Sequence, residues 1–368
     1  MRYPDNSRMT ASDLLTPDFF SPLVVGDLAL PNRIVMAPMA RRRASDSGVV
    51  SELAPLYYSQ RASAGLLITE GTAPSPQGHG SLRMPALYTD EHMAAWRRVT
   101  DAVHAAGGRI VAQLMHSGRV AHSSRLPCGA LPVAPSAVKP AGQVVTPSGM
   151  SDYELPRALE LSEIPAVIAQ YAHATRCALE AGFDGVELHG ASGFLPMQFL
   201  CSGSNLRADA YGGSAERRAR FTVEALEAMA SVAGPGRVGI KLSPEIKHND
   251  AIDANSVQTY STVVSMLNVL KPAYLHVAMS PGSSADYHAL LRPLFRGAYF
   301  AGGGLNRDSA NVLIGSGDAD AAVFGELFLA NPDLPARFAR NAQLNTVDRD
   351  TVYSPGAKGY TDYPALAG

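Results

Sequence analysis

The chain has 368 residues, 46% of them hydrophobic, and a formal net charge of −2 from 31 Lys and Arg against 33 Asp and Glu. A chain of this length can bury a large core, either as two domains or as one elaborated barrel. The balanced charge leaves no electrostatic footprint for nucleic acid or an anionic membrane, so a small-molecule partner is favoured.

The cysteines and the N-terminus indicate a reduced, cytoplasmic protein. Cys128, Cys177 and Cys201 form no even-numbered framework and no C-x-x-C pair, so we expect neither disulfides nor a metal site. The first 15 residues contain no apolar h-region, and no segment approaches about 18 uninterrupted apolar residues, so no membrane span is expected. The oligomeric state stays open between a monomer and a homodimer.

Eight short apolar runs recur along the chain, each followed by turn residues and then by a stretch with helical spacing. This alternation is typical of βα units and a parallel sheet. The expected strands are residues 33–37, 66–69, 109–114, 185–188, 238–242, 274–277, 298–301 and 321–324. Eight strands predict an α/β fold with a closed (β/α)8 TIM barrel, in one domain spanning residues 1–368, rather than an open doubly wound sheet.

Two of the intervening helices carry end signals. The expected helix 90–106 has an acidic first turn and ends before Gly107, and the expected helix 162–181 opens with Ser-x-x-Pro and closes at Gly182. Residues 115–160, after the third strand, are rich in Pro, Ser and Gly and lack a helical period. Such a long insertion at the catalytic face is expected to act as a lid or binding loop.

The chemistry of such barrels lies at the carboxyl ends of the strands, so the residues that follow each run are the site candidates. In chain order they are Pro38-Met39-Ala40, Glu70-Gly71, Gln113 to Arg119, His189, Lys241 to Pro244, Gly302 to Gly304, and Gly325-Glu326. Glycines after strands seven and eight let backbone N–H groups approach a phosphate closely. They therefore predict a phosphate site.

Longer motifs occur in a fixed order along the chain: NRIVMAPMAR, RASAGLLITEGT, IVAQLMHSGR, the segment 184–220, FGELFLANPDLPARF and GYTDYP. From about Leu14 to Pro364, the chain resembles the old yellow enzyme family of FMN-dependent ene-reductases. The resemblance implies an eight-stranded (β/α) barrel that binds FMN, takes hydride from NAD(P)H and acts on an α,β-unsaturated carbonyl.

The resemblance also implies a set of cofactor contacts, in which Gln113 matches a Gln that bonds the pyrimidine edge of the flavin. The other cofactor positions are Pro38, Met39, Ala40, Gly71, His189, Lys241, Gly303, Gly304, Gly325 and Glu326. Ala40 stands where the family has Thr or Cys near flavin O4, and Lys241 replaces an Arg near N1 and O2. Glu326 replaces an Arg that reaches the phosphate, where a carboxylate is repulsive by roughly 1–4 kcal/mol at 4 Å. Glu326 either turns to solvent or marks a scaffold that no longer uses flavin.

Four catalytic positions follow from the same resemblance. His189 and Ser192 fill the places of a His and an Asn or His that hold an enone carbonyl, and a donor aimed at a developing enolate is commonly worth ~3–4 kcal/mol. Phe194 stands where the family has its proton-donating Tyr, and general acid catalysis is worth roughly 10²–10⁴-fold. Tyr353 matches a family Tyr that leans over the substrate. It is either a replacement acid or a structural residue.

Further departures alter the expected substrate pocket. Ser81 stands in for a Tyr after the second strand, and Met115 replaces an aromatic residue near the substrate. Together with Ala40 they predict a remodelled pocket for a larger or less polar substrate, a bulky one of the secondary-metabolite kind. Asp184 and Glu187 are expected to serve packing and salt bridges rather than catalysis.

Three functions stay open. The first and favoured one is FMN-dependent reduction or desaturation of an unsaturated carbonyl. The second is isomerisation or cyclisation with FMN, since the exchange of Tyr for Phe also occurs in the ergot-alkaloid branch of the family, an analogy only. The third is a flavin-independent cyclase or binding protein in which His189 anchors a carbonyl.

Overall fold

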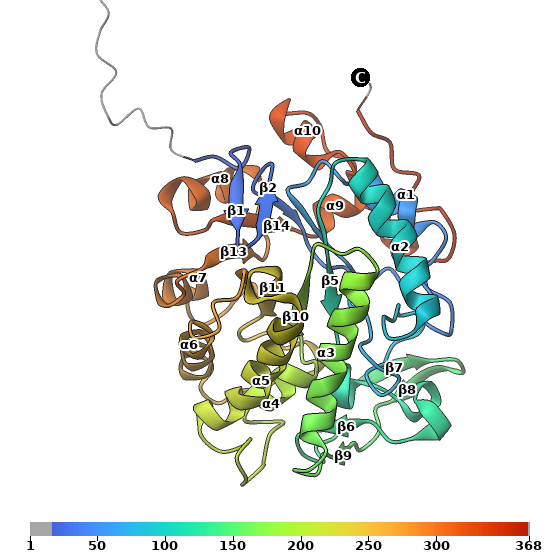
Figure 1. The fold of residues 1–368 in the computed structure, drawn as a ribbon, viewed down its shortest axis with the longest axis vertical. Helices are drawn as coiled ribbons and strands as arrows, with labels where there is room; N and C mark the ends of the chain where they lie inside the picture. The colour runs from blue at the N-terminus through green and yellow to red at the C-terminus, as the bar shows by residue number, and fades with distance from the viewer. Residues whose placement is uncertain (1–16, 367–368) are drawn as a thin grey trace, which may run out of the picture.

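The structure, a computed structural model, describes residues 17–366 and is built around a closed barrel of eight parallel strands (Figure 1). In chain order the barrel strands are β3 Ile34–Met36, β4 Leu66–Ile68, β5 Ile110–Leu114, β10 Gly185–Gly190, β11 Val238–Leu242, β12 Tyr274–Ala278, β13 Ala298–Gly302 and β14 Ala321–Phe324. Each strand lies within two residues of its predicted run. The predicted (β/α)8 barrel is therefore confirmed.

The amino end of the barrel is closed by an antiparallel hairpin, β1 Leu23–Val25 and β2 Leu28–Leu30. Val25, Leu28 and Leu30 pack into one buried cluster with inward-facing side chains of the barrel strands. The hairpin turn is held by a hydrogen bond from the Asp27 N–H to the carbonyl of Gly236, two residues before the start of β11. Because this end is plugged, the only open mouth among the described strands is at their carboxyl ends.

Helices cover the outside of the barrel. They are α1 Ala54–Ser59, α2 Asp90–Ala105, α3 Ile164–Glu180, α4 Leu195–Leu200, α5 Ala215–Ala233, α6 Ser256–Leu267, α7 Tyr287–Leu291, α8 Arg307–Ser316, α9 Glu326–Ala330 and α10 Leu334–Ala339. Within residues 17–366, none of them is long and apolar enough to cross a membrane.

The two helices expected from end signals are present, but one start differs. Helix α2 is capped by the hydroxyl of Thr89, which accepts a hydrogen bond from the His92 N–H. Helix α3 begins at Ile164, two residues after the predicted start at Ser162, a difference within the usual spread of helix ends. Its N-cap residue is Glu163, whose carboxylate is bound by Arg157 instead of capping the helix.

The excursion after β5 is ordered rather than an open loop. It contains a two-residue parallel pair, β6 Val133–Ala134 with β9 Arg157–Ala158, and a hairpin, β7 Gln143–Thr146 with β8 Gly149–Asp152. The hairpin projects at the lower right of Figure 1, on the same side as β6 and β9. The long insertion expected in this part of the chain is thus present. It forms a hairpin whose base is held by the β6–β9 pair.

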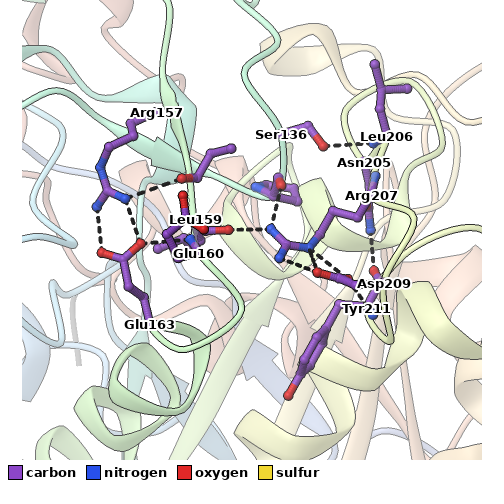
Figure 2. Close-up of polar contacts among 12 residues, drawn as sticks. Ser136, Arg157, Leu159, Glu160, Glu163, Asn205, Leu206, Arg207, Asp209 and Tyr211 are labelled. Carbon is purple, nitrogen blue, oxygen red and sulfur yellow. Dashed lines mark hydrogen bonds and ion pairs between the residues drawn. The ribbon is translucent and has the colours of Figure 1, made fainter.

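The root of the excursion is tied to the barrel by arginines, as Figure 2 shows. The guanidinium of Arg207 donates to the carbonyl oxygens of Pro135 and Leu159 and is held by the carboxylate of Asp209. The Leu206 N–H donates to the Ser136 hydroxyl at 2.9 Å. The segments just after β6 and β9, on either side of the hairpin, are therefore fixed, which sets the position of the hairpin between them.

Candidate active site

Two adjoining cavities lie at the carboxyl ends of the barrel strands. The glycine cavity, of about 530 Å³, is lined among others by Gly302 to Gly304, Gly325 and Glu326. The histidine cavity, of about 450 Å³, is lined among others by Pro38, Ala40, Gly71, Ser81, Gln113, Met115, His189, Ser192, Phe194 and Tyr353. Lys241 lines both cavities. Of the predicted site residues only Met39 lines neither, since it packs against the main core.

The glycine cavity is shaped by backbone that only glycine can adopt. Gly303 has φ +107°, and a Cβ there would lie 2.1 Å from the carbonyl oxygen of Met279. Gly304 also has a positive φ, of +69°, with open space beside it. Backbone N–H groups with no side chain in front of them are what a phosphate group requires. This cradle fits the phosphate of FMN.

Glu326 borders the glycine cavity but already has a cationic partner. Its Oε1 accepts a hydrogen bond from Nη2 of Arg349 at 2.5 Å, and its side chain is 57% exposed. Both solvent and the guanidinium reduce its repulsion toward a phosphate. Of the two alternatives for Glu326, the structure shows the side chain that is turned to solvent.

A buried polar network lies beneath the mouth, because the strand register places its members side by side. Gln113 pairs with Glu187 across β5 and β10, and Lys241 pairs with His276 across β11 and β12. The Glu187 carboxylate accepts from Nε2 of Gln113 at 2.7 Å and lies 3.1 Å from Nδ1 of His276. One of the two N–H donors of the Gln113 amide is thus occupied, which leaves the second N–H and the carbonyl oxygen for a ligand in the cavity.

Lys241 is half-buried between the two cavities. Burial lowers its pKa, and the nearby Glu187 carboxylate opposes that effect. An ammonium group in this position fits an electron-rich ring edge and stabilises added negative charge on it. Among the residues of this network, His276 was not predicted as part of the site. Its signal was one polar residue in the apolar run 274–278.

His189 presents a neutral N–H donor to the cavity that bears its name. Burial lowers its pKa well below the usual range, and the positive charges of Lys241 and His276 lower it further. Its Nδ1 accepts a hydrogen bond from the Ala191 N–H at 3.3 Å, so in the neutral ring the proton is on Nε2. Its ring packs edge to face on Phe194, with centroids 4.7 Å apart.

Ser192 is held in a left-handed backbone conformation, with φ +55°. Such a conformation costs a non-glycine residue roughly 1–2 kcal/mol. Two bonds hold it: its N–H donates to the Ser243 hydroxyl at 2.9 Å, and its carbonyl accepts from Asn249 Nδ2 at 2.8 Å. Its own hydroxyl makes no hydrogen bond within residues 17–366 and lies in the cavity with His189.

The outer wall of the histidine cavity comes mainly from the insertion that the sequence placed at the catalytic face, although the sequence singled out none of the individual wall residues. The hairpin and its flanks contribute Gln143, Val144, Val145, Met150 and Tyr153, and other loops contribute Arg42, His248 and Asn249. The Tyr153 hydroxyl donates to Oδ1 of Asn249 at 3.4 Å, and burial raises its pKa. A signal was available, because Pro147-Ser148-Gly149 between two short polar and β-branched runs is typical of a hairpin turn.

Phe194 and Tyr353 occupy different depths of this cavity. Phe194 packs against two small apolar clusters, one containing Met115 and the other containing Tyr153. Tyr353 is 51% exposed and lies at the rim, where its ring is stacked by Arg42. The position expected for the proton donor is therefore apolar, with tyrosine hydroxyls beside it and at the rim.

A larger cavity, of about 800 Å³, lies beside the mouth between residues 245–257 and 280–284. None of the predicted site residues lines it. Nor does any cluster of three or more possible metal-ligating side chains occur in the part of the chain that the structure describes. The convergent polar groups lie in the two cavities at the strand ends.

Comparisons with known proteins identify the family of this chain. The model of the NADH:flavin oxidoreductase / NADH oxidase family matches residues 18–345. 12-oxophytodienoate reductase 7 from Oryza sativa subsp. japonica is 41% identical over an alignment of 389 positions, which covers 99% of this chain and 97% of that protein. Putative 12-oxophytodienoate reductase 5 from the same organism is 42% identical, with 93% and 92% covered.

Solved structures are equally similar. Morphinone reductase in complex with tetrahydroNAD superposes with a TM-score of 0.91 at 42% identity, covering 95% of this chain and 98% of that one. The old yellow enzyme homologue from Zymomonas mobilis superposes with a TM-score of 0.93 at 38% identity, covering 95% and 100%. The resemblance read from the motifs is confirmed, and the flavin-independent alternative is not favoured. The chain belongs to the NADH:flavin oxidoreductase / NADH oxidase family, as an FMN-dependent, NAD(P)H-dependent oxidoreductase of the ene-reductase type.

Proposed function

We propose that the protein reduces the carbon–carbon double bond of an α,β-unsaturated carbonyl whose body is larger and less polar than a simple cyclic enone. The observation that carries this proposal is the pairing of a neutral His189 donor and a free Ser192 hydroxyl with an apolar wall. That wall includes Met115, Phe194, Val144, Val145 and Met150. The names of the relatives, reductases of 12-oxophytodienoate and of morphinone, support a reductive reaction.

The residues of the glycine cavity would hold FMN by its phosphate, and Gln113 and Lys241 would hold the flavin ring. Bound FMN supplies the hydride transfer from NAD(P)H to the alkene. The protein's part is to orient the alkene and to stabilise the negative charge that develops on the carbonyl oxygen. We assign the second task to Nε2–H of His189 and the Ser192 hydroxyl, because preorganised donors in a water-poor site act most strongly on developing charge.

The proton that completes the reduction needs a source other than residue 194, since a phenylalanine has no exchangeable proton. Tyr353 and Tyr153 both line the cavity. We favour Tyr153, because it is only 8% exposed and its cluster packs against Phe194, whereas Tyr353 is half exposed at the rim. In this assignment the Tyr153 hydroxyl gives its proton to the α-carbon and regains one from water.

Isomerisation and cyclisation remain the chemical alternatives to net reduction, and neither is favoured by an observation at the site. Product stoichiometry decides between them. We expect one NAD(P)H oxidised per saturated carbonyl formed, with a bicyclic enone turned over faster than cyclohexenone. An isomerised product without matching NAD(P)H oxidation would overturn the reduction. Faster turnover of cyclohexenone would overturn the substrate class.

A further inference from the structure

Three arginines in a row follow the first barrel strand, and only the middle one, Arg42, lines the histidine cavity. Arg41 and Arg43 both donate to carbonyl oxygens of the C-terminal segment 351–359, at 2.7 to 3.4 Å. These two arginines therefore anchor that segment, with Tyr353 on it, against the barrel. Anchoring by the flanking side chains leaves Arg42 directed into the cavity.

Arg42 has no counter-charge of its own. Its guanidinium carbon lies 4.9 Å from the centre of the Tyr353 ring, and no carboxylate oxygen of residues 17–366 lies within 4.0 Å of its nitrogens. Its backbone is left-handed, with φ +50°. A left-handed non-glycine residue costs roughly 1–2 kcal/mol, and such strain is concentrated at ligand-binding positions. Stacking on the ring face leaves the N–H groups at the guanidinium edge free to donate.

The charges around Arg42 leave the mouth of the cavity positive. Among the described residues that line this cavity, Glu70 is the one carboxylate, and it is already bound to the backbone N–H of Arg41 at 2.8 Å. Lys241 adds a second positive charge at the inner end. A planar guanidinium with free N–H groups matches a carboxylate or phosphate better than any other ligand group.

We propose that Arg42, stacked on Tyr353, is a subsite for an anionic group on a molecule that occupies the histidine cavity. The group is a carboxylate carried by the unsaturated carbonyl substrate or the 2′-phosphate of NADPH. Its carboxylate form rests on the proposed function, since it describes the substrate of that same reaction. It adds a specificity that His189 and the apolar wall cannot supply, because neither distinguishes an acid from its ester.

Equilibrium binding to the oxidised holoenzyme, measured by calorimetry, tests the proposal without turnover. The substrate probes are 4-oxocyclohex-2-ene-1-carboxylate and its methyl ester, and the nucleotide probes are the non-reactive tetrahydro forms of NADPH and NADH. The Arg42→Met variant should weaken binding of either the carboxylate probe or the 2′-phosphate nucleotide by roughly tenfold or more, while its partner in the pair changes less. This is the effect expected for a lost charge-assisted hydrogen bond. The pair that responds identifies the source of the anion.

The matched control is Arg83→Met. Arg83 also has a left-handed backbone and donates to the Tyr353 carbonyl at 3.4 Å, but it does not line the cavity. Its substitution should change neither pair, and Arg42→Lys should retain part of the preference. Added salt should weaken the member with the additional anionic group, the carboxylate or the 2′-phosphate, more than the other member of its pair.

If Arg42→Met changes the binding affinity of both members of each pair equally, or of neither, Arg42 serves only to pack the C-terminal segment against the barrel. The proposal is then wrong. Failure of the proposed function would be seen separately, as NAD(P)H oxidation that does not match saturated product. The two failures are therefore distinguishable.

Discussion

The glycine cavity and the histidine cavity share Lys241 but are built from different material. The glycine cavity is made of backbone at the ends of β13 and β14, so its shape depends on few side chains and is unaffected by a carboxylate that turns outward. The histidine cavity is made largely of side chains from several strand ends, from the β7–β8 hairpin and its flanks, and from the C-terminal segment. The comparison teaches that the cofactor end can keep its chemistry while the substrate end is rebuilt.

The largest effect is expected at the donor of the histidine cavity. The His189→Ala variant should lower kcat/KM for an enone by about 10²–10³-fold, because one preorganised donor to the developing oxyanion is lost. Steady-state kinetics measures this, with FMN content by absorbance as the control for the neighbouring cavity. His189→Asn should recover part of the rate. Full activity of the alanine variant would remove His189 from the reaction.

Restoring an acid at position 194 should act in the opposite direction. Phe194→Tyr should accelerate enone reduction by about 10²-fold, the lower range for general acid catalysis, because the side chain lies beside His189. Single-turnover reoxidation of the reduced enzyme by enone isolates this step. Tyr153→Phe should slow the same step and Tyr353→Phe should not. If Tyr353→Phe slowed this step and Tyr153→Phe did not, the proton donor would be Tyr353 at the rim.

The substrate end also contains a carboxylate that titrates near neutrality. Burial raises the pKa of Glu70 to about 7, although the Arg41 N–H opposes the shift. Between the pKa that Glu70 has in the unfolded chain and about pH 7, Glu70 is protonated in the folded protein but has lost its proton in the unfolded chain. The free energy of unfolding therefore falls by about 3 kcal/mol as pH rises through that window. Glu70→Gln should remove the decline, as urea unfolding at pH 4.5 and 8 would show; parallel curves would contradict it.

Smaller effects are expected at the cofactor end, where backbone shape matters. Gly303→Ala should weaken FMN binding by about tenfold, since a left-handed alanine costs roughly 1–2 kcal/mol and its Cβ would meet the Met279 carbonyl. Fluorescence titration of the apoprotein with FMN measures the affinity. Gly317→Ala is the control, because Gly317 also has a positive φ, of +79°, but lies outside the glycine cavity, and its Cβ would meet nothing within 4 Å. Equal losses in both variants would argue against a shaped cradle.

The smallest effect is expected at Glu326. Glu326→Gln should change the Kd for FMN by less than about fivefold, because an exposed ion pair is worth about 0.2–1 kcal/mol. The same fluorescence titration applies. A tightening of more than tenfold would show that the carboxylate faces the phosphate instead of Arg349.

Much of the strand-end chemistry could be predicted from local sequence, and most of the substrate wall could not. Gln113, His189 and Lys241 each follow or end an apolar run, so their place at the mouth follows from strand period alone. Arg42 and Tyr153 enter the histidine cavity through partners far away in the chain, at Tyr353 and Asn249. No spacing rule connects those positions.

The family resemblance predicts His189 and Ser192 as the carbonyl-holding residues, and that role stays a prediction. By itself, the sequence determined the eight-stranded barrel and the glycines that line the glycine cavity. Each of these depends on a repeated period or on a residue type that a backbone conformation requires. Only the tertiary structure decided that Glu326 turns to Arg349, that the excursion forms a hairpin held at its base, and that Arg42 reaches the cavity. The physical reason is that a side chain's direction at a loop is set by the partners that folding brings to it.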